Sequence, residues 1–301
     1  MSLSSVLWVA WWSGVTIVGV AGIVASTNSI RMQRRVDREA RGLLEAAETP
    51  TGENHTTLGR LPAPVRRYLA KAIAPGRTTA HTARLEQSGM FRPSLEGKWF
   101  PMSGRQYFTA ASPGFIWWGR VHIAPGIWID AVDRSVNGAG NMLIRAGSTV
   151  TIADAVGPEL DQGALLRLLG ELAWLPTAYL DERYIRWAAV DDRHAIATLA
   201  VNGRQVTGLF EFGTDDFPVR FTANRFRDVG GGKSVLTPFV GECRDYRDAG
   251  GLVVPHQVIG SWVIDGTPAP YARFNITRIE FDVKLPSSKV ITARNYALSA
   301  R

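Results

Sequence analysis

The first thirty residues carry no charged side chain, and this feature constrains the chain more than any other. The run from Leu3 to Ala25 consists mainly of Val, Ile, Leu, Ala, Gly and Trp, and the first basic residue is Arg31. About 20 apolar residues in an α-helix span the hydrocarbon core of a bilayer. The pattern therefore predicts a transmembrane helix over residues 3–27, with the three Trp residues at its start anchoring it at one membrane interface.

A cleaved signal peptide is the competing interpretation of the same segment. Such a peptide has basic residues before its apolar run and a small-x-small cleavage site. No Lys or Arg precedes the run here, and Val24-Ala25-Ser26 is a poor cleavage site. We therefore expect an uncleaved anchor.

A basic cluster follows the predicted anchor directly. Its members are expected to contact anionic lipid headgroups at the membrane surface: Arg31, Arg34, Arg35 and Arg38. The chain has a net charge of +7, but it contains no RNP, zinc-finger or helix-turn-helix pattern, so lipid is favoured over nucleic acid as the partner of this charge. Under the positive-inside rule the cluster places the C-terminal part in the cytoplasm of a bacterial cell. An extracytoplasmic domain is the alternative.

Three regions are predicted along the chain: a transmembrane anchor over 1–29, a juxtamembrane helix and linker over 30–60, and a single β-rich globular domain over 61–301. The juxtamembrane helix is predicted over 30–48 from an apolar stripe at helical spacing, made of Met32, Val36, Leu43, Leu44 and Ala47. A second short helix is predicted over 61–73, because Pro62 and Pro64 suit a helix start.

From Thr79 onward, apolar and polar residues alternate with period two, which is typical of β-strands. Short turns separate the runs, and Asn202-Gly203 is the clearest two-residue hairpin turn. The predicted strands are 81–91, 97–109, 115–124, 127–136, 139–152, 183–190, 193–201, 204–213, 217–228, 235–248, 253–265, 271–284 and 288–298. An amphipathic helix over 161–174 interrupts them, and such a helix typically fills the concave side of a curved sheet. The expected fold is mainly β with N-terminal helices: a bent, half-barrel-like antiparallel meander with one plug helix.

Several ordered motifs resemble a known family. They are Leu61-Pro-Ala-Pro-Val-Arg-Arg-Tyr-Leu69, Trp99-Phe-Pro, Ser112-Pro-Gly-Phe-Ile-Trp117, Gly138-Ala-Gly140, Leu165-Leu-Arg-Leu-Leu-Gly-Glu171 and Trp174-Leu-Pro-Thr-Ala178. This series resembles a bacterial domain-of-unknown-function family, number 6544, over roughly residues 58–284. The resemblance implies an N-terminal membrane helix and a fold similar to the half-barrel of lipoprotein carriers. It brings no catalytic residues with it.

Motifs for catalysis, metals and cofactors are missing or incomplete. Gly230-Gly-Gly-Lys-Ser234 lacks the first glycine of a phosphate-binding loop and precedes a strand, so a hairpin tip is predicted. The five His residues show no ligand spacing, and Cys243 lies in an alternating strand without a neighbouring His in the sequence. We predict no catalytic residue, no metal site and no cofactor.

Glu171 is the one acidic residue with a candidate chemical role. It sits among leucines on the predicted plug helix, where a buried carboxylate requires a partner, expected to be an arginine such as Arg120, Arg145 or Arg225. A structural ion pair is favoured over an acid or base with a shifted pKa. Asp130 and Asp133, three apart on one strand, are expected to point to opposite faces.

Aromatic residues form the remaining candidate site. Phe115 and Trp117 share a face with Trp99, whereas Trp118 points to the other. A set of aromatic residues together with Glu171 could line an apolar ligand site, with a plain hydrophobic core as the alternative: Trp99, Phe115, Trp117, Trp174, Trp187 and Trp262.

These features favour a membrane-tethered, non-enzymatic domain that binds a lipid or another apolar ligand. One alternative is an accessory subunit that docks onto a larger membrane protein complex through the small-residue face of its anchor. The other is an enzyme acting on a membrane-associated substrate.

Overall fold

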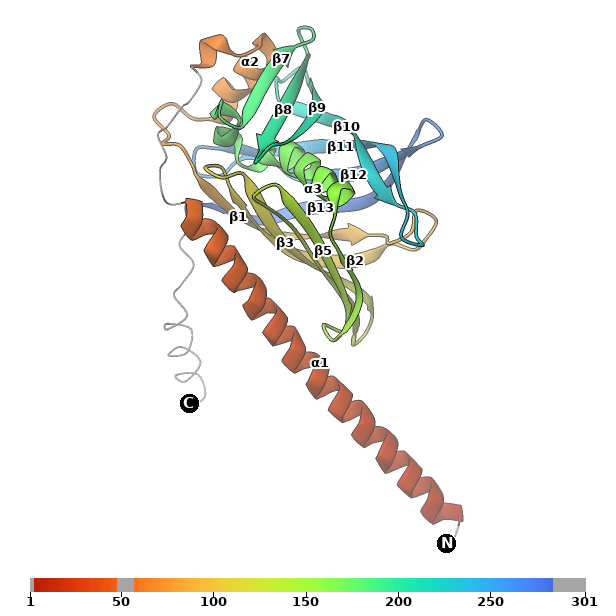
Figure 1. The fold of residues 1–301 in the computed structure, drawn as a ribbon. Coiled ribbons are helices and arrows are strands. Elements are labelled where there is room, and N and C mark those ends of the chain that lie inside the picture. The colour runs from red at the N-terminus through yellow and green to blue at the C-terminus, as the bar shows by residue number, and fades with distance from the viewer. Residues whose placement is uncertain (1–2, 48–56, 284–301) are drawn as a thin grey trace, which may run out of the picture.

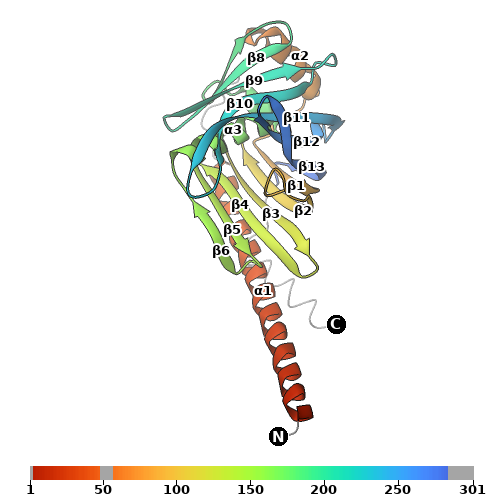
Figure 2. The same ribbon diagram turned by 90° about the vertical axis from the view of Figure 1, so that its right-hand side faces the viewer.

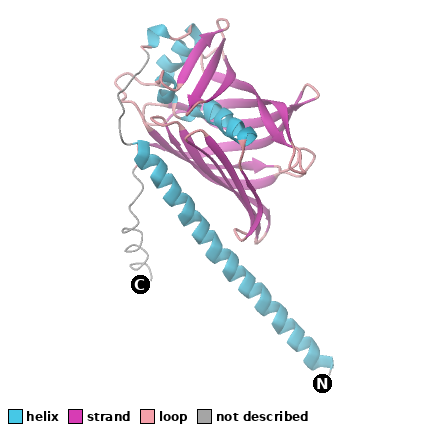
Figure 3. Ribbon diagram, viewed as in Figure 1, coloured by secondary structure: helices cyan, strands magenta, loops and turns pink. Residues whose placement is uncertain are grey.

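The alternating region folds into one antiparallel sheet that curls into a half-barrel (Figure 1). The structure is a computed structural model that describes residues 3–47 and 57–283. Thirteen strands dominate it, with few helices (Figure 3). The mainly β fold predicted from the period-two pattern is therefore confirmed.

The strand bounds follow the predicted runs closely. They are β1 Thr82–Phe91, β2 Phe100–Thr109, β3 Gly114–Ala124, β4 Ile127–Val136, β5 Ala139–Ala146, β6 Val150–Ala155, β7 Ile185–Ala189, β8 His194–Val201, β9 Arg204–Phe212, β10 Pro218–Asp228, β11 Ser234–Asp248, β12 Val253–Ile264 and β13 Thr267–Phe281. One boundary was wrong: the predicted strand over 139–152 is two strands, β5 and β6. Gly147 and Ser148 adopt positive φ angles between them and reverse the chain. The predicted strand over 288–298 lies outside the described residues.

Two meanders make up the sheet. The strand order is β6-β5-β4-β3-β2-β1-β13-β12-β11-β10-β9-β8-β7, so β1–β6 form one arm, β7–β13 form the other, and the pairing of β1 with β13 joins them. The two arms curve toward each other around a central helix (Figure 2).

Two hairpin turns, one from each arm, lie in contact with each other. Asn137-Gly138 joins β4 to β5, Asn202-Gly203 joins β8 to β9, and all four residues have the positive φ angles of a tight hairpin turn. The Asn202 side-chain amide donates to the Asn137 carbonyl at 3.1 Å. A side chain at Gly138 would place its Cβ 2.9 Å from the Val201 carbonyl oxygen, so the close approach requires glycine.

The helices are α1 Leu3–Ala47, α2 Ala63–Ala72 and α3 Pro158–Glu171, with 3-10 turns at Leu58–Arg60, Leu172–Trp174 and Pro176–Leu180. The chain leaves edge strand β6, crosses the inside of the curl as α3, and enters the opposite edge at β7. We call the side of the sheet that faces α3 concave and the opposite side convex. The predicted plug helix is confirmed.

α1 packs its C-terminal half against the convex face of the first arm (Figures 1 and 2). Its apolar stripe contacts alternate residues of β2–β5 in a second hydrophobic core: Met32, Val36, Ala40, Leu43 and Leu44 pack against Tyr107, Ile116, Trp118, Val132 and Leu143. The sequence predicted this stripe, except Ala40, but not the surface that it covers.

The polar side of α1 carries the predicted basic cluster. Arg31, Arg34, Arg35 and Arg38 are all exposed. Most side chains of the apolar run near the N-terminus lie outside the described set. Within the part of the chain that the structure describes, no helix meets the length and apolarity needed to cross a membrane.

Candidate functional site

α3 carries a largely buried polar group that faces the first arm. The helix contacts β4 and β5 of one arm and β8, β9 and β10 of the other, so it bridges the curl. Its leucines enter the main hydrophobic core, whereas Arg167 and Glu171, one turn apart, face the first arm.

Arg167 connects two carboxylates across this contact. Its Nη1 donates to Asp133 Oδ2 at 2.7 Å, and its Nε donates to Glu171 Oε1 at 2.9 Å. The guanidinium also lies over the rings of Phe115 and Trp117, 5.0 and 4.9 Å from their centroids. This single side chain therefore ties α3 to β3 and β4.

Amide side chains extend this polar network. Gln106 donates to Glu171 Oε2 at 2.7 Å, Gln87 donates to Gln106 Oε1 at 3.3 Å, and the Trp117 indole donates to Gln87 Oε1 at 2.8 Å. Both oxygens of Glu171 thus accept hydrogen bonds. A carboxylate whose oxygens are both engaged in this way is held in one position and is typical of a structural network.

The electrostatics of the pair agree with that interpretation. Burial raises the pKa of Glu171, although Arg167 and Gln106 act in the opposite direction. Burial lowers the pKa of Arg167, but the neighbouring Glu171 and Asp133 carboxylates outweigh burial and the pKa is raised. The arginine stays charged and holds the two acids.

The predicted partner of Glu171 was wrong. It is Arg167, one turn earlier on the same helix, not Arg120, Arg145 or Arg225. Arg120 pairs instead with Asp130 on the convex face at 2.8 Å. The prediction that Asp130 and Asp133 point to opposite faces is confirmed, because Asp133 meets Arg167 on the concave face.

The predicted aromatic residues do not form one site. Phe115, Trp117 and Trp174 are buried in the main core. Trp187 packs on Tyr179 and Phe210 with centroid distances of 5.4 and 5.2 Å. Trp118 points to the convex core, as predicted.

Trp99 and Trp262 lie apart from that core and from each other. Arg92 and the exposed Arg273 both lie over the Trp99 ring, with guanidinium carbons 5.1 and 4.5 Å from its centroid. It therefore does not share the site of Phe115 and Trp117. Trp262 is half-buried on β12, where it meets aromatic residues that the sequence did not single out.

These neighbours define what we call the concave aromatic cluster: Phe91, Phe239, Trp262 and Tyr271, all half-buried. Trp262 stacks on Tyr271 at 5.8 Å and meets Phe239 edge-on at 5.6 Å, and Phe91 meets Tyr271 at 6.0 Å. Because Tyr271 sits at a bulge between β12 and β13, strand alternation alone does not predict its direction. The cluster therefore depends on the curl and on this bulge.

Glycines adjoin the cluster. Gly241 of β11 pairs with Gly260 of β12, which pairs with Ala272 of β13. A Cβ at Gly260 would meet the Tyr271 ring at 3.4 Å. Because neighbouring positions on three strands carry small residues, the aromatic rings are the large side chains in this part of the concave face.

Arg225 lies between α3 and the aromatic cluster. Its guanidinium carbon is 5.5 Å from the Phe239 centroid and 5.8 Å from that of Trp262, and its Nε lies 3.3 Å from where a Cβ on Gly163 would be. Among the described residues no carboxylate pairs with Arg225, and its buried Nε has no hydrogen-bond partner there. An unpaired guanidinium beside aromatic rings is suited to an anionic group.

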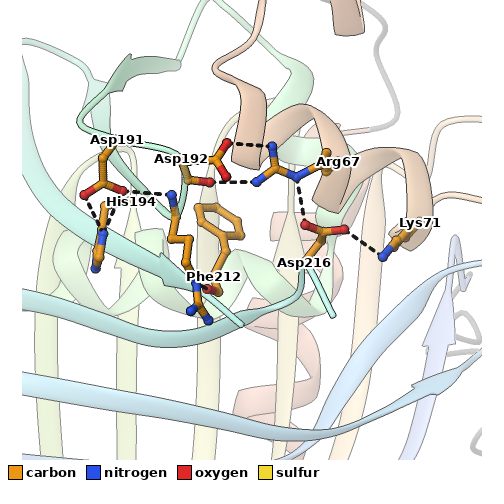
Figure 4. Close-up of polar contacts among 8 residues, drawn as sticks. Arg67, Lys71, Asp191, Asp192, His194, Phe212 and Asp216 are labelled. Atoms are coloured by element: carbon orange, nitrogen blue, oxygen red, sulfur yellow. Dashed lines mark hydrogen bonds and ion pairs between the residues drawn. The ribbon is translucent and has the colours of Figure 1, made fainter. Parts of the chain in front are cut away.

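A second polar cluster, on the outer end of the molecule, links α2 to two turns (Figure 4). Arg67 donates to Asp216 at 2.8 Å and to Asp192 at 3.1 Å, and Lys71 pairs with Asp216 at 2.7 Å. Hydrogen bonds from Lys71 and Arg67 lower the pKa of Asp216. We interpret this cluster as a structural contact that holds α2 against the two turns.

His194 and Cys243 have no reactive arrangement. His194 contacts Asp191 at 2.9 Å beside the α2 cluster (Figure 4). Burial raises the pKa of the Cys243 thiol to about 12, so it is protonated at neutral pH. In the described ranges no three His, Cys, Asp or Glu side chains are grouped to hold a metal ion.

The glycine-rich segment is a turn. Gly230, Gly231 and Gly232 have positive φ angles at the exposed tip between β10 and β11, as predicted. No helix follows the segment, so the helix N-terminus that a phosphate-binding loop needs is missing there.

Comparisons with known proteins agree with the motif resemblance. A model described as a family of unknown function (DUF6544) matches residues 53–274. A search of curated proteins gave no match.

Similar solved structures include a LolA superfamily protein from Nitrosomonas europaea, with a TM-score of 0.41, 9% identity and coverage of 75% of this chain and 96% of that one. A DUF1329 family protein from Desulfovibrio piger has a TM-score of 0.39 and 10% identity, with coverage of 70% of this chain and 89% of that one. A β-barrel-like DUF1849 protein from Brucella abortus has a TM-score of 0.23 and 11% identity, and covers 69% of this chain and 100% of that one.

Proposed function

Given that this chain belongs to the DUF6544 family, whose function is unknown, we propose that it is a membrane-tethered, non-enzymatic domain that binds a lipid on its concave face. The observation that carries the proposal is the concave aromatic cluster with Arg225 beside it. Half-buried rings offer apolar surface to an acyl chain, and the unpaired guanidinium favours an anionic headgroup. Within the network around Arg167, both oxygens of Glu171 accept hydrogen bonds, which supports a structural role for this acid rather than catalysis.

The tether is the uncharged run of α1. In this proposal residues 3–27 cross the bilayer, the exposed arginines that follow contact headgroups, and the domain lies in the cytoplasm. The orientation is tested by fusing green fluorescent protein or alkaline phosphatase after Arg301 in a bacterial host. A fluorescent, phosphatase-negative pair of fusions is the expected result. The opposite pattern would place the domain outside the cytoplasm and overturn the positive-inside assignment.

Lipid binding is tested on the full chain purified in mild detergent, with retained lipid per protein measured by mass spectrometry. We expect about one tightly held anionic lipid. Phe239→Gln should reduce its amount at least fivefold, because a polar side chain replaces a ring of the aromatic cluster. Leu236→Gln is the matched control on the same strand, at a site that is 51% exposed.

The headgroup preference is tested by a second pair of variants. Arg225→Gln should shift the retained lipids from anionic to neutral species. Arg244→Gln, at an exposed arginine of β11, should leave the lipid class unchanged. If the unsubstituted chain retains no more lipid than the Phe239→Gln variant, the result would count against a concave site. Purification of a complex with a stable protein partner would favour the accessory-subunit alternative.

A further inference from the structure

α1 leaves the sheet at the level of two turns. At this point Arg120 Nη2 donates to Ser29 Oγ at 2.8 Å, and Asn28 Nδ2 donates to Thr149 Oγ1 at 3.2 Å. Thr149 lies in the turn between β5 and β6, beside the turn between β3 and β4. The N-terminal part of α1 then projects past the ends of these strands (Figures 1 and 2).

These strand ends carry no Asp, Glu, Lys or Arg and expose three aliphatic side chains. We call residues 121–129 (Val-His-Ile-Ala-Pro-Gly-Ile-Trp-Ile) and 146–153 (Ala-Gly-Ser-Thr-Val-Thr-Ile-Ala) the uncharged tips, because they contain no Asp, Glu, Lys or Arg. Ile127, Val150 and Ile152 are 59%, 63% and 57% exposed. An exposed apolar patch without charges indicates a surface that meets a partner.

A compact polar group holds the tips to α1. Asp130 is fully buried and accepts from Arg120 at 2.8 Å, from the Trp128 indole at 3.0 Å and from Ser148. Arg120 also lies under the Trp128 ring, 4.7 Å from its centroid. Because Arg120 bonds Ser29 as well, the tips and the point where α1 departs form one unit.

We propose that the uncharged tips rest on the bilayer that α1 enters, with Ile127, Val150 and Ile152 in its interfacial region. This inference rests on the proposed tether. Two features favour lipid over a protein as the occupant. First, the tips lie next to the part of α1 that exposes the apolar side chains of Ile23 and Val24. Second, Arg31 follows Asn28 by about one helical turn on the side away from the predicted membrane span, where lipid headgroups would be.

This contact sets the orientation of the curl. α1 is one continuous helix packed on the first arm, so helix and domain tilt together in the membrane, and two additional strand tips on the surface fix that tilt. The concave face would then keep a fixed distance and orientation relative to the bilayer from which a lipid ligand enters.

The test places single cysteines on the full chain in a Cys243→Ser background: Ile127→Cys and Val150→Cys at the tips, Val20→Cys on the tether, and Thr214→Cys in the exposed turn beside α2 as control. Each variant carries an environment-sensitive fluorophore and is reconstituted in liposomes of phosphatidylethanolamine and phosphatidylglycerol with nitroxide-labelled lipid. Unchanged melting temperatures verify the fold.

The expected result is quenching at Ile127, Val150 and Val20, with Thr214 unquenched. Quenching at Val20 alone leaves the tether intact and overturns the membrane contact of the tips. If Val20 is unquenched, the proposed tether itself fails, and the inference that rests on it fails with it. If the cysteines at Ile127 and Val150 are shielded from a water-soluble thiol reagent in native membranes but not in pure liposomes, the inference would also be overturned, in favour of a protein partner.

Discussion

Replacing Arg167 by Met lowers the free energy of unfolding by about 3–5 kcal/mol in our expectation, the cost typical of breaking a buried ion pair by removing one partner. The substitution leaves the carboxylates of Asp133 and Glu171 without their cation, with side chains that are only 2% and 15% exposed. Burial already raises the pKa of Glu171 with Arg167 in place. Without it, both acids must take up protons or the contact between α3 and β4 must open.

Chemical denaturation of the full chain in detergent measures this loss. Arg35→Met is the matched control, because Arg35 makes the same i, i+4 pair with Glu39 on the surface, where its side chain is 52% exposed. Such pairs contribute less than about 1 kcal/mol. Equal effects of the two substitutions would contradict the role assigned to Arg167.

A triple variant separates charge from packing. Arg167→Met combined with Asp133→Asn and Glu171→Gln removes both unpaired charges, and replacing a whole buried ionic group is often close to neutral. We expect it to recover most of the lost stability. Failure to recover would mean that stacking of Arg167 on Phe115 and Trp117 is the larger contribution.

Local patterns in the sequence predicted much of this fold. Period-two alternation predicted the strands to within a few residues, and Asn202-Gly203 predicted a turn whose positive φ angles only a few residue types accept. Residue parity along one strand placed Asp130 and Asp133 on opposite faces. Each of these inferences depends on residues that are close in sequence.

The missed features depend on the curl or on competing partners. The pairing of β1 with β13 brings together residues nearly 200 positions apart, and no local pattern encodes it. Arg225 meets Phe239 across the hairpin of β10 and β11 and Trp262 on the next strand, and this contact depends on the strand register rather than on a pattern within one strand. The partner of Glu171, in contrast, was visible as an i, i+4 spacing to Arg167.

Val36→Asp is expected to have the second large effect, a loss of about 3 kcal/mol or more from a carboxylate placed in an apolar contact. Val36 is 2% exposed in the core between α1 and the convex face, where Tyr107, Ile116 and Trp118 surround the helix. The sheet keeps its own main core under α3, so the expected failure is local: α1 detaches while the half-barrel stays folded.

Hydrogen exchange measured along the chain distinguishes detachment from global unfolding. In Val36→Asp, amides of α1 over residues 29–44 should lose protection, whereas those of β8 and β9 on the far arm should keep theirs. Arg34→Asp is the control, because it introduces the same charge on the exposed side of the same helix. Loss of protection on both arms would mean that the convex core stabilises the whole sheet. In that case α1 would be an integral layer of the domain, and a displacement of its N-terminal part would shift the strands of the concave face as well.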